Sequence, residues 1–135
     1  MTYAPTRARG AQSYAKVGLE TGVHSASPEK LISMLFDGAR TAIARARFAF
    51  EQNNIAARGQ SISKAIDIVA NGLKAALNLD AGGAVAANLY ELYDYIERCL
   101  LMANLRADVS KLDEADRLLA DVASAWNEMG SQNGA

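Results

Sequence analysis

The segment Asn88–Asn104 constrains this chain more than any other, because it predicts a helix with apolar side chains on more than one face. At about 100° per residue, one stripe of this helix would face a protein core. That stripe holds Leu89, Leu92, Tyr93, Ile96, Cys99, Leu100 and Ala103. Tyr90 and Leu101 lie on one shoulder of the stripe, and Tyr95 and Met102 lie on the other. We therefore expect this helix to be central in its domain and also to offer surface to a partner.

The only clearly polar wedge of the same helix holds Glu91, Asp94 and Arg98. Asp94 precedes Arg98 by four residues, which is the favourable order for an acid and a base on one helix. This spacing predicts an ion pair within the helix.

Composition predicts a single all-α domain. The chain has 135 residues, half of them hydrophobic, and its two prolines both precede residue 29. A net charge of −1 argues against a dedicated nucleic-acid binder, and a single cysteine excludes an internal disulfide. No apolar run approaches the roughly 20 residues of a membrane span, and no secretory signal is visible. We expect a cytoplasmic protein without membrane insertion.

Helix start signals and hydrophobic periodicity divide the chain into four helices. Ser27-Pro28-Glu29 is a typical helix start, and the first helix should run from Pro28 to about Gln52. The second should span about Ile55 to Leu79, the third should start at the break Asp80–Gly83, and the fourth should begin near Asp108. Short connections favour an antiparallel four-helix bundle.

The expected domain boundaries follow from these helices. Residues 1–25 lack sustained periodicity and should form a mobile N-terminal arm, with a short extra helix in the arm as the alternative. Residues 26–130 should form the bundle, and residues 131–135 a disordered tail. Gly38 lies inside the first helix, where either a close backbone neighbour or simple tolerance accounts for it.

The first three helices carry more apolar surface than packing on two neighbours would cover. A surplus that continues along helices about 30 Å long is typical of a binding groove. From the pattern alone, self-association of the bundle explains the surplus equally well.

The sequence lacks the residue constellations of an enzyme. His24 is the only histidine, Cys99 falls on the core stripe, and Gly82-Gly83 is not followed by a Gly-Lys-Ser/Thr motif. We expect no catalytic residue, no metal and no cofactor. Arg40, Arg45 and Arg47 form a local basic cluster that a solvated helix face explains better than a nucleic-acid or membrane site.

Several segments together resemble one known family. Ala26-Ser27-Pro28-Glu29-Lys30-Leu31 followed by Met34-Leu35-Phe36-Asp37-Gly38-Ala39 is similar to the first-helix signature of the flagellin-specific export chaperones of the FliS family. The break Asp80–Gly83, the segment Asn88–Tyr95, Ala103-Asn104-Leu105-Arg106 and Ala125-Trp126 also match, in the same order. The resemblance spans roughly Tyr14 to Trp126. This chain departs from the family where Ile96 follows Tyr95, a position at which the family often has methionine.

The resemblance implies a helical bundle that binds the disordered C-terminal segment of flagellin in the cytoplasm, prevents premature polymerisation and delivers flagellin to the type III export gate. It also implies that the arm, through Tyr14 and Val17, covers the client groove or contacts an export-gate component. A co-chaperone or a flagellar regulatory protein would be a further partner. On the first three helices we take the following as candidate client-binding residues: Leu31, Leu35, Ile68, Leu79, Leu89, Tyr90, Tyr93, Tyr95, Leu101 and Met102.

Overall fold

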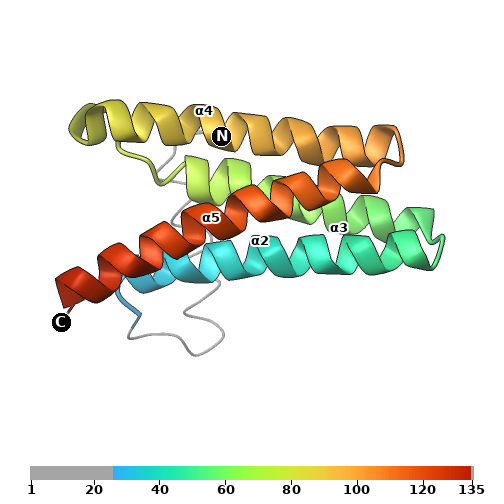
Figure 1. Cartoon of the computed structure of the whole chain (residues 1–135), viewed down its shortest axis with the longest axis horizontal. Coiled ribbons are helices and arrows are strands. Elements are labelled where there is room, and N and C mark those ends of the chain that lie inside the picture. The colour runs from blue at the N-terminus through green and yellow to red at the C-terminus, as the bar shows by residue number, and fades with distance from the viewer. Residues whose placement is uncertain (1–25, 135) are drawn as a thin grey trace, which may run out of the picture.

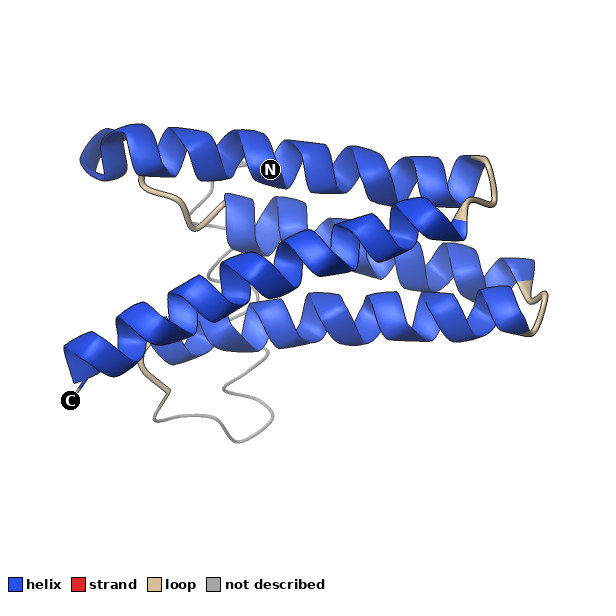
Figure 2. Ribbon diagram, in the orientation of Figure 1, coloured by secondary structure: helices blue, strands red, loops and turns tan. Residues whose placement is uncertain are grey.

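Four antiparallel helices account for the described part of the chain, which in the computed structural model comprises residues 26–134, with side chains for residues 26–130. Helix α2 spans Pro28–Glu51, and α3 spans Ile55–Ile68 and continues directly into the π-helical segment η1, Val69–Lys74. Helix α4 spans Leu79–Leu105, and α5 spans Val109–Gly134. Figures 1 and 2 show the helices side by side, with the α2–α3 and α4–α5 turns at one end. Within residues 26–134 there is no strand, so the predicted all-α four-helix bundle is confirmed.

The predicted helix starts are capped by side chains. The hydroxyl of Ser27 accepts a hydrogen bond from the amide of Lys30 at 3.1 Å, and Pro28 occupies the first turn. The side chain of Asn54 accepts from the amide of Ala57 at 3.0 Å at the start of α3. Asp108 accepts from the amide of Ser110 at 3.0 Å just before α5. Each cap satisfies an amide that the first turn of a helix leaves without an intrahelical partner.

The second helix ends earlier than predicted. We expected it to reach Leu79, but its α-helical part stops at Ile68, η1 ends at Lys74, and Leu79 is instead the first residue of α4. The side chain of Asn78 accepts from the amide of Ala81 at 3.0 Å, which starts a new helix at this point. The apolar period runs unbroken through Ala75 and Leu77, so the sequence pattern gave no sign of the turn.

The glycine break lies inside α4, one turn after its start. Gly83 has φ +55° and ψ −135°, a backbone conformation that only glycine adopts at low cost. At the other end of the chain, α5 continues to Gly134, beyond Gly130, where we expected the helix to end.

The core lies where all four helices meet. Its largest fully buried side chains are Phe36, Ile62, Val69, Ile96, Leu100, Leu112 and Leu119. Helix α2 contributes mainly alanines, including Ala39, Ala42 and Ala46, which allow α3 to approach closely. A Cβ atom added at Gly38 would lie 3.4 Å from Cδ1 of Ile68, so the close neighbour of this glycine is a side chain and not a backbone.

Truncation of a core residue should be far more costly than the same change at the surface. Ile96 is completely buried, so Ile96→Ala should lower the free energy of unfolding by about 2–5 kcal/mol, through lost burial and the cavity left behind. Urea unfolding followed by circular dichroism measures this change. Ile55→Ala is the matched control, because Ile55 is 69% exposed and the change there should cost less than about 0.5 kcal/mol. Equal effects of the two substitutions would contradict the assigned core.

Candidate functional site

Helix α5 follows α2 along its length but leaves α4 after its first turns. Arg47 and Arg40 of α2 pair with Asp113 and Asp116 of α5. Further along, the indole N–H of Trp126 donates to the carbonyl oxygen of Glu29 at 3.2 Å. Figure 1 shows the consequence, since α5 diverges from α4 toward the end of the bundle where α4 begins. We call this the open end, and the opposite end, with its two turns, the turn end.

The apolar stripe of α5 loses its cover toward the open end. Leu112, Ala115 and Leu119 are 0% exposed, whereas Val122 and Trp126 are half-buried and Met129 is 55% exposed. The stripe of α5 remains apolar toward the open end, although α4 lies further from it there. A stripe of this kind gains free energy when a further apolar segment covers it.

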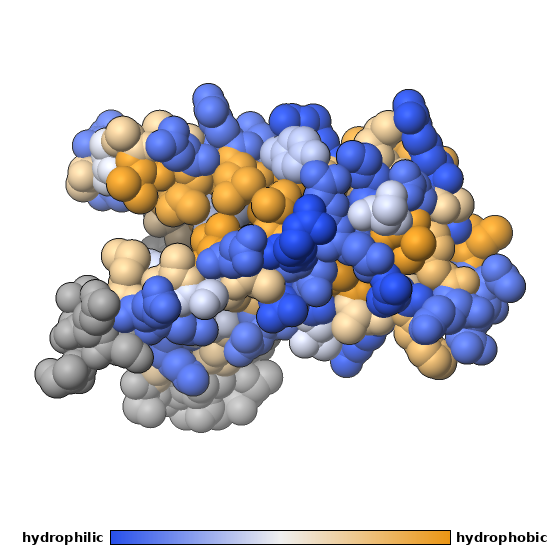
Figure 3. Space-filling view, in the orientation of Figure 1, coloured by the Kyte–Doolittle hydropathy of each residue, from blue (hydrophilic) through white to orange (hydrophobic). Residues whose placement is uncertain are grey.

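Helix α4 shows the same gradient on its facing side. Ile96 is completely buried, Leu92 and Leu89 are half-buried, and Val85 is 69% exposed. In Figure 3, hydrophobic residues gather over the half of α4 near the open end and line the hollow beneath it. We define the open groove by the apolar residues of these two helices toward the open end: Val85, Leu89 and Leu92 of α4, and Leu118, Val122 and Trp126 of α5.

A polar cluster closes the open groove on the side of the turn end. The hydroxyl of Tyr95 donates to the carboxylate of Glu114, and Lys111 lies 3.1 Å from the same carboxylate. These bonds lower the pKa of Glu114, mainly through the Tyr95 hydroxyl, and the bond to Glu114 raises the pKa of Tyr95. The cluster fixes α4 to α5 at the point from which they diverge.

Cys99 lies beside this cluster but in the core. It is 2% exposed, and burial raises the pKa of its thiol, so the protonated form is favoured. This agrees with its predicted role as a small hydrophobic residue. Among the described residues, no group of three or more metal-ligating side chains comes together.

A second charged cluster fixes η1 to α4. The amine of Lys74 lies 2.6 Å from Asp94 and 2.8 Å from Glu97, and 5.0 Å from the centre of the Tyr90 ring. Burial lowers the pKa of Lys74, but the hydrogen bonds to the two carboxylates outweigh it, so the pKa is raised overall. The predicted pair within α4 is absent. Asp94 bonds to Lys74 instead, and Arg98 lies over the ring of Tyr95 at 5.7 Å.

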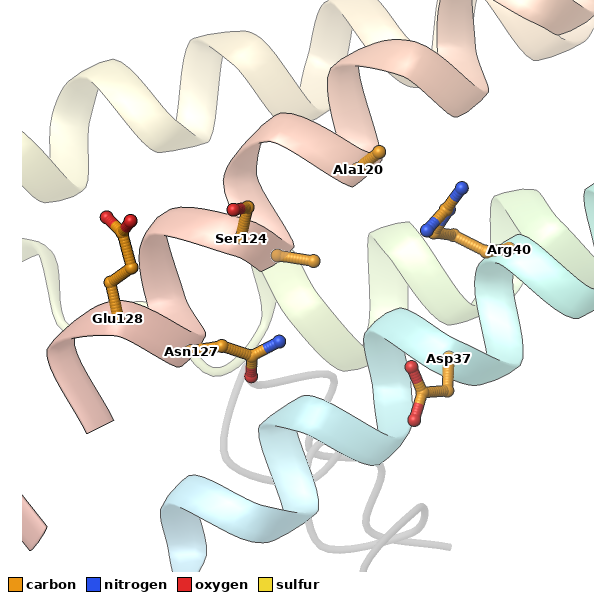
Figure 4. Close-up of a pocket in the computed structure, with 7 residues that line it drawn as sticks. Asp37, Arg40, Ala120, Ser124, Asn127 and Glu128 are labelled. Carbon is orange, nitrogen blue, oxygen red and sulfur yellow. The ribbon is translucent and has the colours of Figure 1, made fainter. Parts of the chain in front are cut away.

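The seam between α5 and α2 is polar. Besides the arginine–aspartate pairs, the hydroxyl of Ser33 donates to the side chain of Asn127 at 3.3 Å. Figure 4 shows the hollow of about 630 Å³ that opens along this seam, with Asp37 and Arg40 on one wall and Ser124, Asn127 and Glu128 on the other. Its lining is too polar to hold an apolar segment, so the open groove is the better candidate for such a client.

The structure does not bring all the predicted client-binding residues to one surface. Leu35, Ile68 and Tyr93 lie in the core, where burial raises the pKa of the Tyr93 hydroxyl to about 12. Tyr95 is held by Glu114, and Tyr90 lies on the opposite side of α4 beside Lys74.

The remaining predicted residues keep accessible surface. Leu89 belongs to the open groove, and Leu31 and Leu79 are half-buried at the same end of the bundle. Leu101 is exposed and Met102 half-buried, nearer the turn end. Tyr14 and Val17 lie outside the described residues. Client binding at these positions remains a prediction.

Of the six residues that define the open groove, only Leu89 was among the predicted client-binding residues. Leu118, Val122 and Trp126 belong to α5, whereas we expected surplus apolar surface only on the first three helices. The pattern gives the direction of an apolar face but not the angle at which a neighbour crosses it. The large apolar residues Trp126 and Met129 near the end of that helix were the only available signal.

Comparison with known proteins links this bundle to one family. The family described as "Flagellar protein FliS" matches residues 10–133. The flagellar secretion chaperone FliS of Salmonella typhimurium is 51% identical over 122 residues, which cover 90% of each chain. The protein of the same name from Escherichia coli is 45% identical over 121 residues, covering 90% of this chain and 89% of its own. FliSB of Pseudomonas aeruginosa is 40% identical over 116 residues, covering 86% of this chain and 91% of its own. None of the described helices is long and apolar enough to cross a bilayer.

The Tyr95–Glu114 bond should make stability depend on pH. A carboxyl whose pKa is lower in the folded state stabilises the fold above its unfolded pKa, and this gain disappears as the pH falls through the folded pKa. Wild type should therefore melt at a higher temperature than Glu114→Gln at pH 6, and the difference should shrink steadily below about pH 4.5. Thermal unfolding at a series of pH values measures this. A difference that grows on acidification would show that Glu114 does not stabilise the fold as a carboxylate.

Proposed function

Because the chain belongs to the FliS family of flagellar secretion chaperones, we propose that it binds the disordered C-terminal segment of flagellin in the cytoplasm. Binding covers the surfaces through which flagellin subunits polymerise, and it presents an unfolded client to the flagellar export gate. The role is one of binding and delivery, without catalysis.

The open groove is the observation that carries this proposal. The apolar stripes of α4 and α5 face each other, and their exposure rises from 0% at Ile96 and Leu119 to 69% at Val85 and 55% at Met129. An amphipathic client segment can lie between the two helices with its apolar side inward, in the manner of a helix in a groove. The half-buried indole of Trp126 and the leucines of α4 offer a large contact area with few rotatable bonds.

Ordering an unfolded client segment costs about 2–5 kcal/mol, so the contact must extend along several turns of both helices.

The proposal also gives the N-terminal arm a role in client binding or export. Tyr14 and Val17 either cover the open groove before the client arrives or contact the export gate. Tyr14→Ala distinguishes these roles. Tighter client binding identifies a covering segment, whereas unchanged client binding with weaker binding to the export gate identifies a docking segment.

Calorimetry with a flagellin C-terminal peptide tests the proposal directly. We expect binding near 1:1 with a negative heat-capacity change, because apolar surface is buried. Leu92→Glu and Val122→Glu should each weaken binding roughly tenfold or more, equivalent to about 1.4 kcal/mol or more, because each places a carboxylate in the open groove.

Ile55→Glu is the matched control, since it makes the same substitution at an exposed aliphatic residue of the turn end and should bind as wild type does. Circular dichroism must show that all three variants remain helical. No binding at micromolar concentrations, or an equal loss from Ile55→Glu, would count against the open groove. A tight dimer whose interface buries the groove, observed by sedimentation, would favour self-association instead.

A further inference from the structure

The α2/α3 seam differs from the other three seams of the bundle. Side-chain hydrogen bonds or ion pairs join α3 or η1 to α4, α4 to α5, and α5 to α2. The α2/α3 seam also carries polar side chains, but these make no hydrogen bond or ion pair with another described residue. They are Thr41 and Arg45 of α2, and Gln60, Ser61 and Lys64 of α3.

These polar residues surround a hollow of about 460 Å³. Gly38 and Ala42 of α2 and Ile68 of α3 complete its lining, so small residues leave room between the two helices. Ile68 is 4% exposed and Ala42 is 5% exposed, so both belong to the core on which the hollow rests. The hollow therefore has an apolar base and polar walls.

The charged side chains that line the hollow are all positive. Arg45 projects from α2 and Lys64 from α3, and no carboxylate lines the space between them. The neighbouring arginines differ, because Arg40 and Arg47 are paired with aspartates of α5. Two cations on opposite walls that pair with no other described residue favour a ligand that carries carboxylates.

The seam also has the shape of a helix-binding surface. Gly38, Thr41, Arg45 and Phe48 follow one another at intervals of three or four residues, so they form one stripe along about 15 Å of α2. Phe48 is 63% exposed at the end of this stripe. A partner that fills the seam would therefore combine acidic residues with an apolar residue that covers Phe48.

We propose that the α2/α3 seam is a second docking surface, which binds an acidic amphipathic helix of another protein. In the ring of helices α2–α3–α4–α5, this seam is diagonally opposite the α4/α5 pair that forms the open groove. The two surfaces share no residue, so a client and the second partner bind at the same time. The proposal does not depend on the identity of the client.

A displayed library of 16-residue helix-forming peptides, selected on the full chain, identifies the preferred ligand without prior choice. We expect enrichment of sequences with two or more acidic residues beside a large apolar residue. The best peptide, made synthetically, should bind at least tenfold more weakly to Arg45→Glu/Lys64→Glu. The matched control is Arg106→Glu/Arg117→Glu, which changes the charge equally at exposed residues after α4 and on α5, and it should bind as wild type does.

A substitution that changes no charge tests whether the shape of the hollow also matters for peptide binding. Thr41→Trp fills the hollow without altering a charge, and it should also weaken the peptide at least tenfold while circular dichroism and flagellin-peptide binding stay unchanged. The proposal is overturned if selection yields no acidic preference, or if both charge-reversal variants lose binding equally. It is also overturned if only inorganic phosphate or anionic lipid vesicles bind at Arg45 and Lys64, or if the acidic surface of a second copy occupies the seam in sedimentation experiments.

Discussion

The divergence of α5 from α4 determines the surface of this bundle. Trp126 and Asn127 hold the far part of α5 against the start of α2, while Tyr95 and Glu114 hold its first turns against α4. Helix α5 is therefore bonded to α2 at both ends, through Asp113 and Trp126, but to α4 only near its start, and it leaves α4 beyond that point. The apolar stripes that would otherwise close into a core therefore remain open at one end. The open groove is a consequence of where the polar bonds lie, because the apolar residues themselves continue unchanged.

Polar contacts have different functions on different sides of the molecule. Along α2 and α5, the pairs Arg40–Asp116 and Arg47–Asp113 hold the crossing angle, although exposed pairs of this kind contribute little to stability. Lys74, between Asp94 and Glu97, fixes the π-helical segment below the groove. On the α2/α3 seam the polar residues bind nothing within the described chain. Core packing and the contact of Arg58 with the ring of Phe50 join these two helices, which leaves the outer edge of the seam available to another protein.

The sequence was a good guide to the helices and a poor guide to the angles between them. Pro28, Asn54 and Asp108 mark helix starts through local chemistry, and the buried face of α4 followed from its period. The turn before Leu79 was missed, because an asparagine cap interrupts a helix without interrupting the apolar pattern. Tyr93 and Ile68 were taken as surface candidates, and Val122 and Trp126 were not, because the sequence does not give the angle at which one helix crosses its neighbour. Which apolar residues remain uncovered depends on contacts between helices, and the sequence of one helix does not predict these contacts.

Trp126 offers the most direct measurement of the central claim, since it is the only tryptophan of the chain and lies half-buried in the open groove. Its fluorescence should be recorded during titration with a tryptophan-free flagellin C-terminal peptide. If the client covers the groove, the emission should shift to shorter wavelength and acrylamide quenching should decrease in parallel with binding. Binding that leaves both the emission and the quenching of Trp126 unchanged would show that the client lies elsewhere.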